Sequence, residues 1–362
     1  MMSSHDKIWN TEEIQDEVIC FSADASGAEI GGNLLYAPQQ ILRLCSWDGQ
    51  TQYEQDRDFT VSGRRILRTG NSRIPFLTRE TYCRPYAGQP EKAWLRLPSG
   101  NEYMEIFPEI YRWQCRVSYR HKERWTGFIP QQQTSRLPRS MGMLDSGAPL
   151  NLVFYGDSIT VGWEASGCDE HAVNLACEEI HLLHNRPPWQ SAWAQVVTGA
   201  LSEAYPKALI RKFNRSAGAA TTGWGAENAK KLVGPCAPDL VVLAFGMNSL
   251  QDTPERFLAE IQEILVQIRL GNPQCEFLLV SPMTPSDEIA GLQNNQLARQ
   301  EAALASLCTA SPGIALAPVH AVFREMALRG KTHIDLTGNC INHPNDFAVR
   351  VYAQTILAVL GI

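Results

Sequence analysis

The 362-residue sequence lacks the features that mark nucleic-acid binders, membrane proteins and exported proteins. It has 32 basic against 38 acidic residues, so no cationic excess is available for nucleic acid. No apolar run approaches the roughly 18 residues that a membrane span needs. The opening "MMSSHDKIWNTEEIQDEVICF" has neither the basic nor the apolar segment of a signal peptide. We therefore expect a cytoplasmic protein with no nucleic-acid or membrane partner, and the sequence leaves its oligomeric state open.

Paired cysteines are also lacking. The ten cysteines are scattered, none forms a CxxC pair, and most lie in apolar runs such as "LVGPCAPDL", which predicts reduced, buried thiols. One stretch, "CEEIHLLH", places Cys177, Glu178, His181 and His184 at a helical spacing that suits zinc. No second ligand pair accompanies it. We predict no metal and no cofactor, with a zinc hydrolase as an alternative.

The hydrophobic pattern divides the chain into two regions. Residues 1–130 contain short alternating runs such as "DFTVSGRRILRTG", which predict an all-β, jelly-roll-like sandwich. Residues 131–149 are rich in Pro, Gln, Ser and Gly and are expected to form a linker. In residues 150–362, apolar runs such as "LNLVFYG" and "LVVLAFG" alternate with amphipathic stretches such as "ERFLAEIQEILVQIRL". This alternation predicts an α/β domain, with helices on both faces of a parallel sheet.

Polar residues follow the predicted strands of this sheet. "GDSIT" (156–160) follows the first strand, "NRSAGAATTGWG" (214–225) the second and "FGMNS" (245–249) the third, while "NCINHPND" (339–346) precedes the last helix. Ligands of open α/β sheets bind beyond the carboxyl ends of the strands. We therefore expect Ser, Gly, Asn and His to meet at one edge of the sheet.

A serine at the end of a buried strand suits nucleophilic catalysis. Ser158 lies on the predicted strand-to-helix turn, and His343 is the candidate base that removes its proton. Asp157 is expected to cap the helix and to support the nucleophile loop, not to take part in the chemistry.

Ester hydrolysis also needs hydrogen-bond donors for the tetrahedral oxyanion. The candidates are the backbone N–H of Ser158, a backbone N–H from Gly218 or Ala219, and the side-chain amide of Asn248. Each of these motifs alone also fits an ordinary turn or cap. Their order, each after the appropriate strand, favours catalysis.

The order GDSIT, N…GA, GMN and HPN resembles the SGNH hydrolases, also called GDSL esterases. The resemblance implies a flavodoxin-like α/β/α fold over 150–362 and hydrolysis of small O-acyl or acetyl esters. It carries over Ser158 as nucleophile, His343 as base and Asn248 as oxyanion donor. A preceding β-sandwich is similar to two-domain carbohydrate esterases, which implies acetylated carbohydrate substrates. The alternatives are an acyltransferase using the same site and a non-catalytic carbohydrate-binding protein with a decayed site.

The chain departs from the pattern of this family at three positions. Ala219 stands where the family usually has glycine, and Ser249 where it usually has aspartate. The acid of the family usually lies three residues before the histidine, and Cys340 occupies that position.

The partner of the second ring nitrogen of His343 is therefore open. Asp335 lies eight residues upstream and reaches the ring only if the loop folds back, whereas Asp346 is expected to cap the final helix. We favour a backbone carbonyl, which would make the site a Ser–His dyad, over Asp335 as orienting acid.

The segment from Trp163 to Trp193 is a long insertion after the first strand and is expected to shape the substrate pocket. Trp163, Trp189, Trp193 and Trp224 are candidates for stacking on sugar rings, and core packing is the alternative for each.

Overall fold

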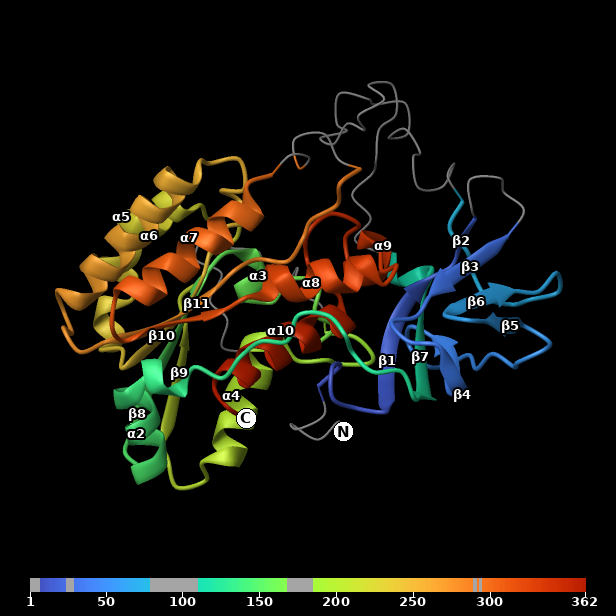
Figure 1. The fold of residues 1–362 in the computed structure, drawn as a ribbon, viewed down its shortest axis with the longest axis horizontal. Helices are drawn as coiled ribbons and strands as arrows, with labels where there is room; N and C mark the ends of the chain where they lie inside the picture. Colours follow the sequence, from blue (N-terminus) through green and yellow to red (C-terminus); the bar gives the residue numbers. More distant parts are fainter. Residues whose placement is uncertain (1–6, 24–28, 79–109, 168–184, 289–291, 293–294) are drawn as a thin grey trace.

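The structure is a computed structural model with two regions side by side along the long axis of the molecule (Figure 1). The α/β elements lie on the left of this view and the N-terminal strands on the right. The residues that the structure describes are 7–23, 29–78, 110–167, 185–288, 292 and 295–362.

The C-terminal region is built on a five-stranded, wholly parallel sheet with the strand order β12-β11-β10-β8-β9. Four of its strands are almost fully buried because helices cover both faces, whereas the edge strand β9 is partly exposed. This arrangement confirms the predicted flavodoxin-like α/β/α fold. The bounds are Leu150–Gly156 (β8), Ile210–Asn214 (β9), Leu240–Ala244 (β10), Glu276–Val280 (β11) and Ile314–Ala317 (β12).

Alternate side chains of each strand enter different cores. In β8, Phe154 packs in the core that α4, α8 and α10 cover, whereas Tyr155 packs against α5 and α6 on the other face. Side-chain caps begin α5 and α6, where Thr221 accepts the N–H of Trp224 and Thr253 accepts the N–H of Arg256. The bounds are Trp193–Ala204 (α4), Thr222–Leu232 (α5), Pro254–Arg269 (α6), Leu297–Ala310 (α7), Val319–Leu328 (α8), His333–Leu336 (α9) and Asp346–Val359 (α10).

The N-terminal region contains two antiparallel sheets, in the orders β1-β7-β4 and β2-β3-β6-β5. This arrangement confirms the expectation of a β-rich region before the α/β fold. The bounds are Glu13–Cys20 (β1), Ser22–Ala23 (β2), Ile30–Asn33 (β3), Pro38–Ser46 (β4), Phe59–Ser62 (β5), Arg65–Arg68 (β6) and Gln114–His121 (β7).

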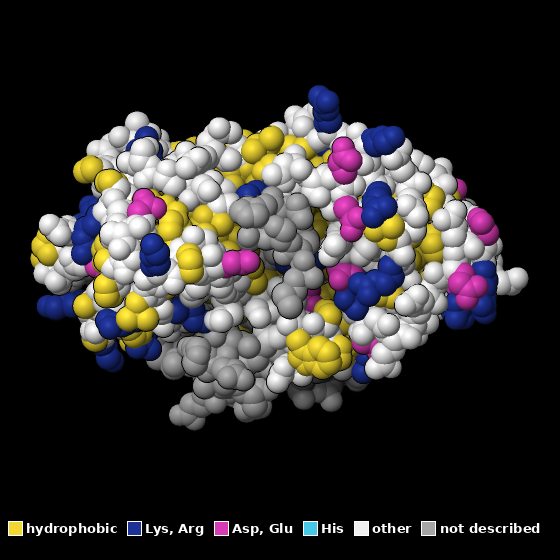
Figure 2. Space-filling view, turned by 90° about the horizontal axis from the view of Figure 1, so that it is seen from below, with side chains coloured by type: hydrophobic (Ala, Val, Ile, Leu, Met, Phe, Trp, Pro, Cys, Tyr) yellow, Lys and Arg dark blue, Asp and Glu magenta, His cyan; other side chains and the backbone are white. Residues whose placement is uncertain are grey.

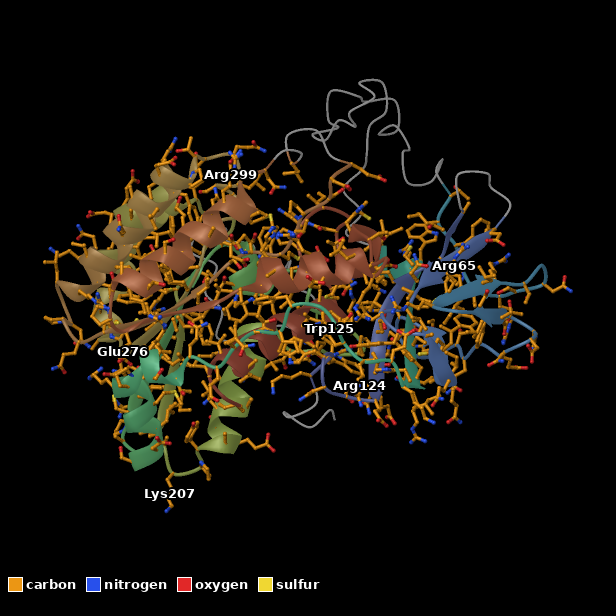
Figure 3. The ribbon with its side chains drawn as sticks, in the orientation of Figure 1. Arg65, Arg124, Trp125, Lys207, Glu276 and Arg299 are labelled. Atoms are coloured by element: carbon orange, nitrogen blue, oxygen red, sulfur yellow. The ribbon has the colours of Figure 1, made fainter. Side chains whose placement is uncertain are left out.

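The segment expected as a linker contains a helix, α2 (Pro138–Ser146). Pro138 fits the first turn, and Gly147 ends the helix in the left-handed region at φ 75°. Glu276 of β11 accepts hydrogen bonds from the N–H groups of Arg139 and Ser140, and Figure 3 places it beside α2. A tertiary contact thus supplies the cap that the sequence of this helix lacks.

A buried ion pair joins the two regions. Lys331 Nζ lies 2.9 Å from Glu17 Oε1, and both side chains are fully buried. The same ammonium donates to the carbonyls of Val18 at 2.7 Å and Asn33 at 2.9 Å. Nearby, the Arg329 guanidinium lies 4.4 Å from the ring of Trp125, which Figure 3 places between the helices and the N-terminal strands.

The N-terminal strands also contact α9. The backbone N–H of Cys20 in β1 donates to Asp335 Oδ1 at 2.8 Å. The amide of Gln114 in β7 donates to the carbonyls of Ile334 and Thr337, both at 2.8 Å. The first sheet therefore supports the chain just before the loop that carries His343.

Seven cysteines fall in the described ranges, and all are free and buried, as predicted. The candidate zinc ligands Cys177, Glu178, His181 and His184 lie outside the described residues. Within those residues, no three His, Cys, Asp or Glu side chains cluster in a way that suits a metal ion.

Nor does any helix of the described ranges combine the length and apolar character needed to cross a bilayer. On the face shown in Figure 2, acidic side chains lie among the basic ones.

Candidate active site

The nucleophile candidate begins a one-turn helix at the end of β8. Ser158 is the first residue of α3 (Ser158–Val161) and is 5% exposed. Gly156 makes the turn possible, because a Cβ there would lie 2.3 Å from both the Ala244 carbonyl oxygen and Thr160 Oγ1. The serine therefore emerges at the carboxyl end of a central strand, where the sequence placed it.

Asp157 caps this helix, as expected. Its carboxylate accepts a hydrogen bond from the N–H of Ile159 at 3.0 Å and another from the N–H of Met247. Burial raises the pKa of Asp157 to about 7. The side chain thus links the nucleophile loop to the loop that carries Asn248.

The structure brings Ser158 and His343 together. His343 Nε2 lies 2.7 Å from Ser158 Oγ, which is hydrogen-bond distance. The indole ring of Trp163 covers the imidazole, with 5.5 Å between ring centroids. Burial lowers the pKa of His343 to about 4, so the ring is neutral near pH 7. A neutral imidazole in contact with a hydroxyl has the geometry of a general base.

The other ring nitrogen contacts Asn339, which is not among the predicted site residues. Asn339 Nδ2 lies 2.5 Å from His343 Nδ1. A side-chain amide therefore takes the place of the expected backbone carbonyl.

Neither candidate acid is engaged with the imidazole. Asp335 forms a capping box with Thr332 at the start of α9, and its other oxygen accepts the N–H of Cys20. Asp346 accepts the N–H of Ser166 at 2.8 Å and its hydroxyl at 2.7 Å. The cap of α10 is Asn345, one residue before the position expected from the sequence.

The conformation of Cys340 explains why the residue four positions before the histidine faces it. Cys340 has a φ of 61°, in the left-handed region, and it is fully buried. Its side chain packs in an apolar cluster with Cys20 and Ile341. The family's acid position therefore points away from the imidazole, and Asn339 occupies the space beside Nδ1.

The candidate oxyanion donors lie on two neighbouring loops. Asn248 is exposed and donates one amide N–H to the Ala220 carbonyl at 3.1 Å, which leaves the second N–H of its amide for a ligand. Gly218 is buried, whereas Ala219 is exposed and has a φ of 58°. This left-handed conformation gives a physical reason for the glycine that the family usually has at position 219.

Ser249, the second departure from the family pattern, fixes the Asn248 loop. Its hydroxyl oxygen accepts the N–H of Thr222 at 3.0 Å and lies 2.9 Å from Thr222 Oγ1. Thr222 Oγ1 donates in turn to Glu260. The start of α5 and the Asn248 loop are thereby tied together by hydroxyl groups.

The four candidate tryptophans have different positions. Trp193 is fully buried against Phe154 and belongs to the core, and Trp224 is half-buried beside Tyr155. Trp189 is 61% exposed on the 185–191 loop. Of these four, Trp163 contacts the imidazole and Trp189 is the one with a largely exposed ring.

Comparisons with known proteins identify the family of this chain. A family model described as the GDSL-like lipase/acylhydrolase family matches residues 154–350, more than half of the chain. No curated protein matches.

Similar solved structures include a two-domain esterase active on acetylated mannans, at 19% identity and a TM-score of 0.47, covering 65% of this chain and 54% of that one. They also include an acetylxylan esterase from Geobacillus stearothermophilus, at 17% identity and a TM-score of 0.45, covering 59% and 94%. An α/β hydrolase from the metagenome of Lake Arreo, Spain, has 22% identity and a TM-score of 0.44, covering 59% and 95%. The match spans about half the length of the two-domain esterase.

Proposed function

We propose that this chain, which belongs to the GDSL-like lipase/acylhydrolase family, cleaves small O-acyl esters, acetyl esters above all. In this proposal it is an SGNH-type carboxylic ester hydrolase with Ser158 as nucleophile. The observation that carries the proposal is the 2.7 Å contact between Ser158 Oγ and His343 Nε2 at the end of a central parallel strand.

The reaction follows from this contact. His343 takes the proton of Ser158 on Nε2 while Oγ attacks the carbonyl carbon of the ester. The protonated imidazole then gives that proton to the leaving alcohol, and an acyl-serine remains. A water molecule, deprotonated by the same ring, releases the acid and restores Ser158.

Three groups are the candidate donors to the oxyanion. The Ser158 N–H lies at the start of α3, where helix geometry provides no internal acceptor. The free N–H of the Asn248 amide and a backbone N–H of Gly218 or Ala219 complete the set. Loss of one such donor typically lowers kcat by about 10²–10³-fold.

An exposed aromatic side chain supports a carbohydrate as the alcohol part of the ester. Trp189 presents its ring to solvent on a loop that hydrogen bonds hold in place. Gly167 N–H donates to the carbonyl of Gln190 at 2.9 Å, and Gln190 N–H donates to Ser166 Oγ at 2.8 Å. Ser166 is itself bound to Asp346, three residues after His343. An exposed aromatic ring on a loop that is hydrogen-bonded to the start of α10 suits stacking on a sugar ring.

One observation favours a second candidate function. Asn339 stands beside His343 where a catalytic triad has a carboxylate, which is compatible with a carbohydrate-binding protein whose site has lost its activity.

Hydrolysis of p-nitrophenyl acetate by the wild type, Ser158→Ala and EDTA-treated protein separates these candidates. The esterase proposal expects turnover above the buffer rate that Ser158→Ala removes and EDTA leaves intact. Equal rates for the wild type and Ser158→Ala would leave the binding function as the better account. A series of acetylated sugars and p-nitrophenyl esters of increasing chain length would then define the acyl and alcohol preferences.

A further inference from the structure

We propose that Asn339 is a positioning residue that holds His343 in the Nε2–H tautomer, the form that cannot accept the proton of Ser158. The inference rests on the proposed roles of Ser158 and His343, and it identifies the contact that limits the reaction at this site.

The donor and acceptor chemistry of the contact fixes the tautomer. Asn339 Nδ2 is an amide nitrogen, which only donates, and it lies 2.5 Å from His343 Nδ1. Nδ1 must therefore accept, so the single proton of the neutral ring is on Nε2. Nε2–H then donates to Ser158 Oγ across the 2.7 Å contact, instead of accepting from it.

The orientation of the Asn339 amide is set by the backbone around it. Asn339 Oδ1 accepts the N–H groups of Ile341 at 3.0 Å, Asn342 at 3.0 Å and His343 at 3.1 Å. Its Nδ2 also donates to Asn342 Oδ1 at 3.2 Å. Turning the amide over would place an NH₂ group against three N–H donors. Because Asn339 is only 4% exposed, water would not easily replace those bonds.

Catalysis from this resting state requires a proton rearrangement. To accept the proton of Ser158, the ring must carry its own proton on Nδ1. One proton therefore leaves Nε2 for solvent and another binds Nδ1, so the number of protons on the ring does not change. Nδ1–H would then face the N–H of Asn339, donor against donor. The imidazolium formed in the transition state has the same conflict, because it also carries a proton on Nδ1.

The size of the effect can be set by comparison with the serine-protease triad. There, replacing the orienting aspartate by asparagine preserves the geometry but lowers kcat by about 10⁴-fold, because the histidine adopts the wrong tautomer. This chain carries asparagine at the corresponding contact. Its rate should therefore lie about 10²–10⁴-fold below that of a version with a carboxylate there.

Asn339→Asp tests the inference directly. The substituted side chain has the same shape, so one oxygen can keep the three backbone N–H groups while the other accepts Nδ1–H. We expect kcat/KM for p-nitrophenyl acetate to rise by about 10²–10⁴-fold. Asn342→Asp is the matched control, since it adds the same charge nearby but contacts Asn339 and not the imidazole. We expect the control to change kcat/KM by less than about tenfold.

The ¹⁵N chemical shifts of His343 provide a readout that does not depend on activity. In the wild type and in Asn342→Asp, Nε2 should be protonated and Nδ1 should not, whereas in Asn339→Asp the assignment should reverse. A proton on Nδ1 in the wild type would overturn the inference, even if Asn339→Asp failed to fold. So would a folded Asn339→Asp protein with no gain in rate.

Ser158→Ala in both backgrounds separates this inference from the proposed function. If Ser158→Ala leaves the rate of hydrolysis unchanged in both backgrounds, the esterase proposal fails. The ¹⁵N shifts of His343 still decide the tautomer in that case.

Discussion

The buried ion pair between the two regions makes a strong prediction about stability. Lys331→Met keeps the length of the side chain but removes the ammonium that contacts Glu17 at 2.9 Å. Among the residues that the structure describes, the carboxylate of Glu17 would keep only the N–H of Leu35 and the hydroxyl of Tyr119 as donors.

The cost follows from what the ammonium now satisfies. All three of its protons have acceptors, namely Glu17 and the carbonyls of Val18 and Asn33. Breaking a buried pair by removing one partner typically costs about 3–5 kcal/mol, because the remaining charge is uncompensated. Domains have about 5–15 kcal/mol of stability in total, so the variant would lose a large part of it.

Urea denaturation measured by circular dichroism and tryptophan fluorescence checks this prediction. With an m value of about 3 kcal/mol per M, the midpoint should fall by about 1–2 M. The double variant Glu17→Gln/Lys331→Met should recover much of the loss, because it leaves no unpaired charge. A shift below about 0.3 M for Lys331→Met, or a double variant less stable than Lys331→Met alone, would refute the reasoning.

Three further predictions concern the site and its surroundings. Ala219→Gly should stabilise the protein by about 0.5–1 kcal/mol in thermal unfolding, because glycine adopts the left-handed φ of 58° without strain. The greater flexibility of glycine in the unfolded chain offsets part of this gain, and a loss of stability would contradict the prediction. Burial lowers the pKa of His320 from 6.5 in the unfolded chain to about 4, so this group's contribution to stability is present above pH 6.5 and is lost as the pH falls through 4. His320→Gln should therefore reduce the stability difference between pH 7 and pH 4 by about 3 kcal/mol, and an unchanged difference would count against the assignment. In the wild type, kcat/KM should fall on the acid side near pH 4, where His343 titrates. A second inflection near pH 7, where Asp157 titrates, should disappear in Asp157→Asn.

The parallel sheet was predictable because helix packing on both faces gives its strands continuous apolar runs, as in "LVVLAFG". Ser158 and Asn248 could be located because each immediately follows such a strand. The helix α2 was missed, since Glu276, a residue distant in sequence, holds its N-terminus.

The partner of His343 could not be predicted for a similar reason. Nothing in "NCINHPND" indicates that Cys340 adopts a left-handed conformation, which turns the expected acid position into the core. Asp335 lies near His343 in the sequence, but its carboxylate is hydrogen-bonded within α9 and to β1. Local pattern identifies the candidate nucleophile, whereas tertiary contacts decide how the candidate base is held.

The contacts between the first sheet and α9 connect the N-terminal region to the proposed active site. Asp335 and Gln114 anchor the short helix whose next residues form the turn around His343. A fragment beginning at residue 150 would retain Ser158 and its strand but lose the surface that shapes the histidine turn. Separation of the two regions, whether by proteolysis, truncation or mechanical force, should then abolish the proposed hydrolysis before the α/β fold itself unfolds.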